Sequence, residues 1–118
     1  MKEHVFIITV NTWTWYKVDG NDITDIKTTI VHLADSHKAA ETYIQEHLTE
    51  TFGWFEIVPA TVGGNIYSEL CTFYNMGGKK VETSRLTELY DQTKANFLKE
   101  KETRMRKRDV PIVDARLA

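Results

Sequence analysis

The first third of the chain has the apolar pattern of two long strands joined by a tight turn. The stretch from Val5 to Val18 is first apolar on both faces, as in a strand covered on both sides, and then alternates. Asp19-Gly20-Asn21-Asp22 tolerates positive φ and reverses the chain. The β-branched stretch from Ile23 to Leu33 returns, with its side chains divided between two faces: Ile26, Thr28 and Ile30 on one, Val31 and Leu33 on the other. This pattern predicts a β-hairpin.

A helix and a second pair of strands follow in the pattern. Asp35 or Ser36 can cap the helix, and Gly53 is expected to end it. Its apolar stripe has helical spacing and consists of Ala40, Tyr43, Ile44, His47, Leu48 and Thr51. Two strands are then expected at 54–58 and 66–76, separated by a loop that contains Pro59 and a Gly-Gly-Asn sequence.

A second, longer helix is expected after Gly77-Gly78, capped by Thr83 or Ser84. Its apolar stripe ends at Phe97, and the charged run that follows still has helix-forming residues and i,i+4 ion pairs. Pro111 disfavours helix in the residue before it, so the helix is expected to stop near Asp109. The sequence then predicts an extended apolar tail over 110–113.

These elements predict an α+β fold of order ββαββα. The natural assembly is a four-stranded, mainly antiparallel sheet with two helices on one face, the second helix long and extended. With 118 residues the chain is expected to form a single domain, with an α+β core over 1–98 and a basic helical extension and tail over 99–118.

Charge divides unequally along the chain. Residues 1–78 carry 4 Lys and Arg against 10 Asp and Glu, whereas residues 79–118 carry 11 against 7, which gives net charges of −6 and +4. Such asymmetry suggests a charged partner or self-association. Cys71 is the single cysteine, and the chain shows neither a signal-peptide pattern nor an apolar run of spanning length, so we expect a cytoplasmic protein.

Motifs for cofactors and metals are missing from the sequence. Neither of the glycine-rich phosphate-binding patterns occurs, and the four histidines lack the spacing of zinc ligands. We therefore expect no cofactor, no metal and no catalytic constellation. The residues that an enzyme would have to recruit are His37, Glu69 and Cys71, of which Cys71 lies on a predicted strand among aromatic residues, where a cysteine is usually a small buried hydrophobe.

Two groups of residues are candidates for binding. Trp13 and Trp15 stand on one face of a predicted strand, where they would form a stacking platform or a protein anchor if that face is open, or part of the core if helices cover it. The second group shares one face of the charged helix end, where arginine can grip phosphate, and consists of Lys101, Arg104, Lys107 and Arg108. Duplex DNA fits this acidic body poorly.

The stretches Val10-Asn11-Thr12-Trp13-Thr14-Trp15 and Arg104-Met105-Arg106-Lys107-Arg108-Asp109 belong to an aromatic-rich sheet and a charged helical extension. In this layout the chain resembles small phage or mobile-element accessory proteins of the anti-defence type. The resemblance implies binding of a host effector, or sequestration of a nucleotide signal, in the cytosol of a host cell.

The sequence thus leads to a non-enzymatic binding protein that works as an oligomer through its C-terminal helix and tail. A dimer would set the Arg104 and Arg108 face of one chain against the aromatic sheet of another and form a cleft for an anionic, nucleotide-like ligand. The alternatives are a small enzyme acting on a nucleotide or sugar, and a protein inhibitor that docks through surface tryptophans.

Overall fold

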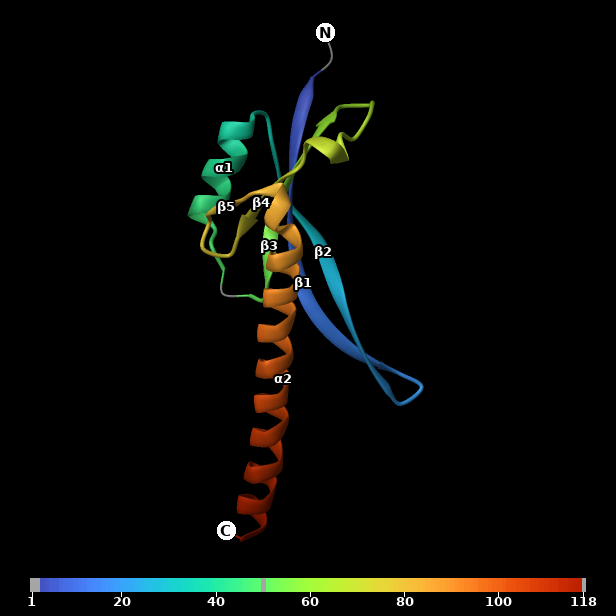
Figure 1. The fold of residues 1–118 in the computed structure, drawn as a ribbon, viewed down its shortest axis with the longest axis vertical. Helices are drawn as coiled ribbons and strands as arrows, with labels where there is room; N and C mark the ends of the chain where they lie inside the picture. Colours follow the sequence, from blue (N-terminus) through green and yellow to red (C-terminus); the bar gives the residue numbers. More distant parts are fainter. Residues whose placement is uncertain (1–2, 50, 118) are drawn as a thin grey trace.

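The computed structural model describes the backbone of residues 3–49 and 51–117, and the side chains of these residues up to position 104. Along the chain the elements are β1 (His4–Val18), β2 (Asn21–Ala34), α1 (His37–Glu46), β3 (Gly53–Thr61), the short 3₁₀ helix η1 (Ser68–Leu70), β4 (Thr72–Asn75), β5 (Lys80–Val81), a second 3₁₀ helix η2 (Thr83–Arg85) and α2 (Leu86–Leu117) (Figure 1).

The fold is α+β, with an antiparallel sheet and a long second helix, as the sequence predicts. Within the described residues the sheet has five strands in the order β2-β1-β3-β4-β5, so the prediction of four strands is wrong. The segment predicted as one strand over 66–76 is divided between an isolated bridge at Ile66, η1 and β4. Gly78, at φ 83°, then turns the chain so that β5 pairs with β4.

The predicted hairpin of β1 and β2 is confirmed. Asp19 and Gly20 form its turn with φ of 51° and 81°, the doubly positive geometry whose twist matches a two-residue hairpin. β3 pairs with β1 only as far as Thr12, so among the described strands the rest of β1 pairs with β2 alone. The end of the hairpin therefore projects from the sheet as a two-stranded ribbon (Figure 1).

Helix α1 begins where the sequence predicts. Ser36 caps it, because its hydroxyl oxygen accepts a hydrogen bond from the backbone N–H of Ala39 at 3.0 Å. The helix ends at Glu46 and not at Gly53, which instead opens β3. A side chain at position 53 would clash with the backbone of Asn11 on β1, so glycine is required there by close strand approach.

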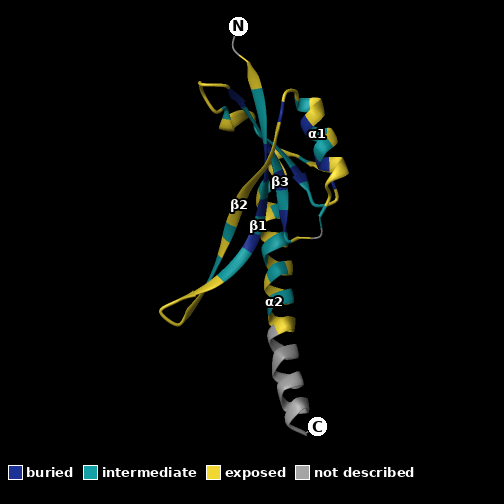
Figure 2. Ribbon diagram, turned by 180° about the vertical axis from the view of Figure 1, so that it is seen from behind, coloured by how far each residue is buried: buried dark blue, intermediate teal, exposed yellow. Residues whose placement is uncertain are grey.

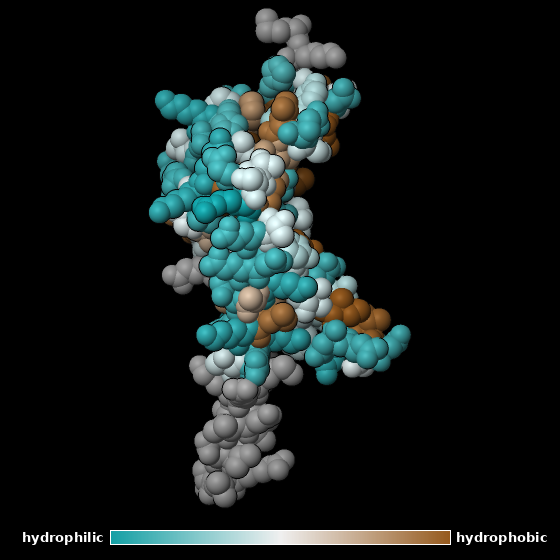
Figure 3. Space-filling view, viewed as in Figure 1, coloured by the Kyte–Doolittle hydropathy of each residue, from teal (hydrophilic) through white to brown (hydrophobic). Residues whose placement is uncertain are grey.

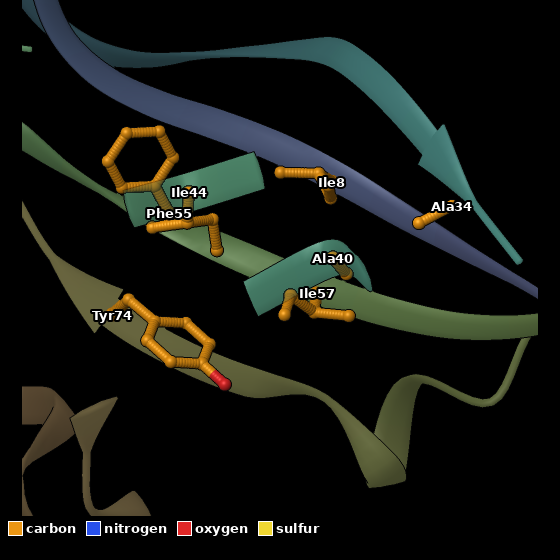
Figure 4. Packing of buried hydrophobic residues seen from close by; sticks show 7 residues of the cluster. All are labelled: Ile8, Ala34, Ala40, Ile44, Phe55, Ile57 and Tyr74. Carbon is orange, nitrogen blue, oxygen red and sulfur yellow. The ribbon is translucent and has the colours of Figure 1, made fainter. Parts of the chain in front are cut away.

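The main core lies between α1 and the sheet. Its buried side chains come from both hairpin strands, from α1, from β3 and from β4: Ile8, Ala34, Ala40, Ile44, Phe55, Ile57 and Tyr74 (Figure 4). Ile8 stands opposite Ile57 in the pairing of β1 with β3, which fixes the face of each strand that meets α1.

The helices cover opposite faces of the sheet, so the prediction of two helices on one face is wrong. Ile8 of β1 packs in the core with α1, whereas Trp13, an odd number of residues further along the same strand, contacts Thr93 of α2. Successive side chains of a strand point to opposite faces, so α2 lies on the side away from α1. We call these the α1 face and the α2 face.

Helix α2 is longer than expected. It continues to Leu117, so the predicted stop near Asp109 and the extended tail over 110–113 are wrong. Proline removes one backbone donor from a helix, and here the helix continues through Pro111. The structure describes only the backbone over 105–117, so the side chains of the predicted apolar tail lie outside its described part.

Candidate protein interface

Trp13 is part of the packing between β1 and α2. It is 6% exposed, and its indole N–H donates to the hydroxyl of Thr93 at 2.9 Å. The ring of Tyr90 lies edge-on at 4.7 Å between centroids, and that of Trp54 at 6.5 Å. Of the two alternatives left open by the sequence, the structure shows the core alternative for Trp13, which offers no open stacking platform.

Trp15 and Lys101 form a contact within the chain. The Lys101 Nζ lies 4.3 Å from the ring centroid of Trp15 and 3.5 Å from Oδ2 of Asp22, near the hairpin turn. The Lys101 side chain is 11% exposed. Its ammonium group is therefore held by an aromatic face and a carboxylate of the same chain, and not presented to an external anion.

The other members of the predicted basic face do not complete a binding site in the described side chains. Arg104 is exposed, and its Nε lies 3.3 Å from Oε1 of Glu100 one helical turn earlier. Lys107 and Arg108 lie outside the described side chains. The structure thus brings Trp13, Trp15 and Lys101 together in one helix–sheet contact, and leaves Arg104 at the surface.

His37 belongs to a hydrogen-bonded network on the α1 face. Its Nδ1 lies 3.2 Å from Oε1 of Glu41 and its Nε2 3.1 Å from the hydroxyl of Thr72. The other oxygen of Glu41 accepts a hydrogen bond from the Tyr74 hydroxyl at 2.8 Å. Burial, with the hydrogen bond to Glu41 acting in the same direction, raises the pKa of Tyr74 to about 12. Both imidazole nitrogens are engaged, so the network orders the α1–β4 contact.

Cys71 lies on the other side of the sheet from this network. Its thiol is hydrogen-bonded to Glu56, which points to the α2 face because its neighbours Phe55 and Ile57 point into the α1 core. Burial raises the pKa of the Cys71 thiol to about 12, and the hydrogen bond and negative charge of Glu56 add to this effect. The structure therefore does not bring Cys71 and His37 together as a nucleophile and its base.

A shallow depression of about 650 Å³ lies along the outer side of α1. Within it the ring of Tyr43 is stacked between two imidazoles, 4.2 Å from His32 and 3.9 Å from His47 between centroids. The two histidines occupy both faces of the tyrosine, so this depression offers no free aromatic slot for a base. Nor do three or more His, Cys, Asp or Glu side chains gather as metal ligands anywhere in the described residues.

Part of the α2 face is not covered by the helix. The pairing of the strands aligns Leu33, Ile7 and Val58 in one row and Ile30, Thr9, Glu56 and Phe73 in the next. We call the apolar members of these rows the open face: Ile7, Ile30, Leu33, Val58 and Phe73. Ile30 is 64% exposed and Leu33 58% exposed, whereas the other members are half-buried.

A β-bulge brings the two exposed members of the open face together. The pairing of β1 with β2 shifts between Ile8 and Thr9, so that β2 contains one extra residue, Val31. The extra residue reverses the alternation, and Ile30 and Leu33 consequently lie on the same face of the sheet. The sequence pattern had assigned them to opposite faces, because a bulge leaves no obvious mark in an apolar run.

Hydrogen bonds join the polar side chains beside the open face, which we call the polar floor: Thr9, Asn11, Thr28 and Glu56. The hydroxyl of Thr28 donates to Oδ1 of Asn11 at 2.6 Å, and the Asn11 amide donates to the Thr9 hydroxyl at 3.2 Å and to Glu56 at 3.5 Å. Thr9 and Asn11 are buried. The floor therefore has its polar groups satisfied internally, and the apolar side chains around it remain available for contact.

Further exposed apolar side chains lie on the segment between β3 and β4: Val62, Ile66 and Leu70. Figure 2 shows that exposed residues also follow β2 along most of its length. Figure 3 shows apolar side chains gathered along one side of the molecule, over the β3–β4 segment and near the hairpin tip, with the surface hollowed between them.

Comparison with known proteins finds no matching family model, no matching curated protein and no matching solved structure. In the described part of the chain, no helix combines the length and the apolar character needed to cross a membrane.

Proposed function

We propose that this chain is a non-enzymatic binding protein that holds another protein against the open face of its sheet. The observation that carries the proposal is the exposure of Ile30 and Leu33, side by side on the sheet face that α2 covers at Trp13. Contiguous apolar surface of this kind, with a polar rim, is typical of protein interaction sites.

The open face is better suited to a protein than to an anion. Its large side chains are aliphatic and aromatic, and the charged group within its rows is Glu56, a carboxylate. Of the cations expected to hold a nucleotide-like ligand, Lys101 is held by Trp15 and Asp22, and Arg104 is paired with Glu100. A negatively charged ligand would meet no compensating charge on the open face.

The open face also replaces the tryptophans as the docking surface of the inhibitor hypothesis. Trp13 is buried against α2, so a partner cannot reach it without displacing the helix. Ile30 and Leu33 need no such rearrangement. Binding of a host effector therefore remains our proposal, through different residues from those suggested by the sequence.

The test is a double substitution, Ile30→Thr with Leu33→Thr, which places β-branched threonine at both strand positions while removing apolar area. The matched control is Leu48→Thr, which removes an exposed leucine from the segment that follows α1. The wild-type chain, immobilised, should retain a protein from an extract of the cells in which it is made, and calorimetry with that purified partner should show binding at least tenfold weaker for the double variant.

The control should bind the partner as the wild type does, and circular dichroism should show all three chains folded. Equal binding by the double variant, or no retained protein, contradicts the proposal. A parallel incubation with a panel of nucleotides and sugars tests the enzyme alternative, since conversion of any of them would show catalysis. We expect each compound to be recovered unchanged.

A further inference from the structure

The outer edge of β2 is unpaired in the described structure. β2 is a strand of 14 residues at the end of the sheet, and its pairing partner is β1. An edge of this length exposes a row of N–H and C=O groups to which another strand can bind. The bulge at Val31 interrupts the edge near its end, so the regular part is Asn21 to Ile30.

The backbone of Ile26 shows which groups point outward. Its N–H donates to the Oδ1 of Asp25 at 2.8 Å, a neighbouring side chain on the same strand. This N–H therefore points away from β1, and the Asp25 carboxylate satisfies it in place of a neighbouring strand. In antiparallel pairing such a group exchanges hydrogen bonds with the residue directly opposite.

We propose that two copies of this chain pair through their β2 edges, antiparallel, about a two-fold axis that passes through Ile26. In such a pairing the axis is perpendicular to the sheet, so residues that oppose each other share a face, and every register is centred on one residue. A register centred on position 25 sets Asp25 against the partner's Asp25, and one centred on 27 sets Lys27 against the partner's Lys27. Both are repulsive.

The register centred on Ile26 is complementary. It sets Asp25 opposite the partner's Lys27, and by symmetry Lys27 opposite the partner's Asp25, with all four side chains exposed on the α1 face. Ile26 then exchanges backbone hydrogen bonds with the partner's Ile26. The Asp25 carboxylate, released from the Ile26 N–H by the partner's carbonyl, becomes free to pair with the partner's Lys27.

The same register completes the open face. It sets Asp22 opposite the partner's Ile30, and Asp22 is the residue that holds Lys101 of α2. The two-fold axis keeps the α2 faces of both copies on one side of the joined sheet. Each open face therefore gains, as a neighbour, the helical turn of α2 that contains Lys101 in the other copy. A different protein bound at the open face would then contact both copies. The pairing itself does not rest on the proposed function.

Charge exchange tests the register. D25K sets a lysine against the partner's Lys27, and K27D sets an aspartate against the partner's Asp25, so each should weaken the dimer about tenfold. The double variant D25K/K27D restores two opposite-charge pairs and should restore the wild-type dissociation constant. Sedimentation equilibrium of the full chain at micromolar to 100 micromolar concentrations measures all four.

Cross-linking tests the position of the axis. In a Cys71→Ala background, Ile26→Cys places two thiols on the axis, with Cα atoms about 5.5 Å apart, within reach of a disulfide. Thr28→Cys in the same background places them roughly 13 Å apart along the strands, out of reach. Under mild oxidation I26C should yield a disulfide-linked dimer, whereas T28C should yield no covalent dimer.

Several results would overturn the pairing. They are a wild-type chain that stays monomeric at 100 micromolar, a dimer that D25K and K27D leave unchanged, a double variant no better than the single ones, and T28C cross-linking as readily as I26C. A dimer that persists in both charge variants would instead indicate an interface elsewhere, such as the C-terminal helix. Circular dichroism of each variant, all at exposed or half-buried positions, verifies that the comparison is between folded chains.

Discussion

The indole N–H of Trp13 donates to the hydroxyl of Thr93 across 80 residues of sequence. The Thr93 hydroxyl in turn donates to the carbonyl of Leu89 at 2.8 Å. The bond therefore joins the middle of β1 to the backbone of α2 through one side chain. Its loss would leave a buried donor without a partner, which costs more than the bond itself contributes.

Thr93→Val should accordingly destabilise the fold by about 1–3 kcal/mol, because valine keeps the shape of threonine but leaves the buried indole N–H of Trp13 without an acceptor. Trp13→Phe combined with Thr93→Val should cost less than the sum of the two single changes. Urea denaturation of the four chains gives the coupling energy, and strict additivity would show that the bond contributes nothing.

Truncation of the tryptophans should distinguish their roles. Trp13→Ala removes a ring that is nearly fully buried and should cost about 3–5 kcal/mol, enough to unfold a marginal domain. Trp15→Ala removes a half-buried ring on the projecting ribbon and should cost less. The measurement is the denaturation midpoint of each variant relative to the wild type, and equal shifts in the two variants would contradict the difference in packing.

Lys101 should stabilise the hairpin tip locally. Lys101→Met keeps the aliphatic stem but removes the charge that faces Trp15 and Asp22. Amide hydrogens near the turn should then exchange faster, and the free energy of local opening derived from exchange should fall by about 1 kcal/mol. Arg104→Gln, which breaks an exposed i,i+4 pair, is the control and should change exchange little. Similar protection in K101M and wild type would argue against the contact.

The Cys71 thiol should be unreactive in the folded protein. With its pKa raised from 9.0 to about 12, the thiolate fraction at pH 8 falls by about a thousandfold relative to an unfolded chain, so alkylation should be slower by about that factor. The folded state also retains this proton between pH 9 and 12, whereas the unfolded state loses it. Stability should therefore decline as pH rises through this window, and less steeply in Cys71→Ala.

At Gly53 the backbone of β3 lies close against that of β1. A Cβ at this position would lie 1.7 Å from the backbone oxygen of Asn11, so Gly53→Ala should cost more than about 3 kcal/mol. Gly63→Ala is the matched control: no atom lies within 4 Å of its Cβ, and its φ of 70° should cost roughly 1 kcal/mol. Thermal unfolding of both variants measures the two losses of stability, and a loss in Gly53→Ala no larger than that in Gly63→Ala would contradict the close strand approach.

Local signals in the sequence were sufficient for the hairpin and for the start of α1. Asp19-Gly20 predicts the hairpin because glycine and aspartate adopt positive φ at low cost, and Ser36 predicts the helix because its hydroxyl can bond to an orphan N–H. Both features depend on a few adjacent residues. Sequence reasoning is most reliable where the controlling interaction is this short in range.

The arrangement of the helices depended on a signal that was present and misapplied. The stretch from Val5 to Val10 is apolar on both faces, which indicates cover on both sides of the strand. In the structure Ile8 meets α1 from one face of this strand and Trp13 meets α2 from the other. Strand alternation alone thus implied two covered faces, whereas the predicted assembly placed both helices on one face.

The contact of Lys101 with the sheet could not be predicted from hydrophobicity, because lysine is a charged residue. Thr93, Phe97 and Lys101 follow one another at intervals of four, so Lys101 continues the face of α2 that meets the sheet. An apolar stripe read by hydrophobicity stops at Phe97. The lysine stem and its ammonium group complete the contact against Trp15, which only the folded position of the hairpin reveals.

The order of elements along the chain has a consequence for synthesis. The ribosome completes β1 before any residue of α2, so the aromatic side of the hairpin emerges without the helix that later covers it. Trp13 must wait for Thr93, and Asp22 for Lys101. Until then the nascent chain exposes the tryptophan side of its hairpin, and chaperone binding and aggregation both begin at exposed apolar surface of this kind. Helix α2, which is made after all five described strands, closes this surface.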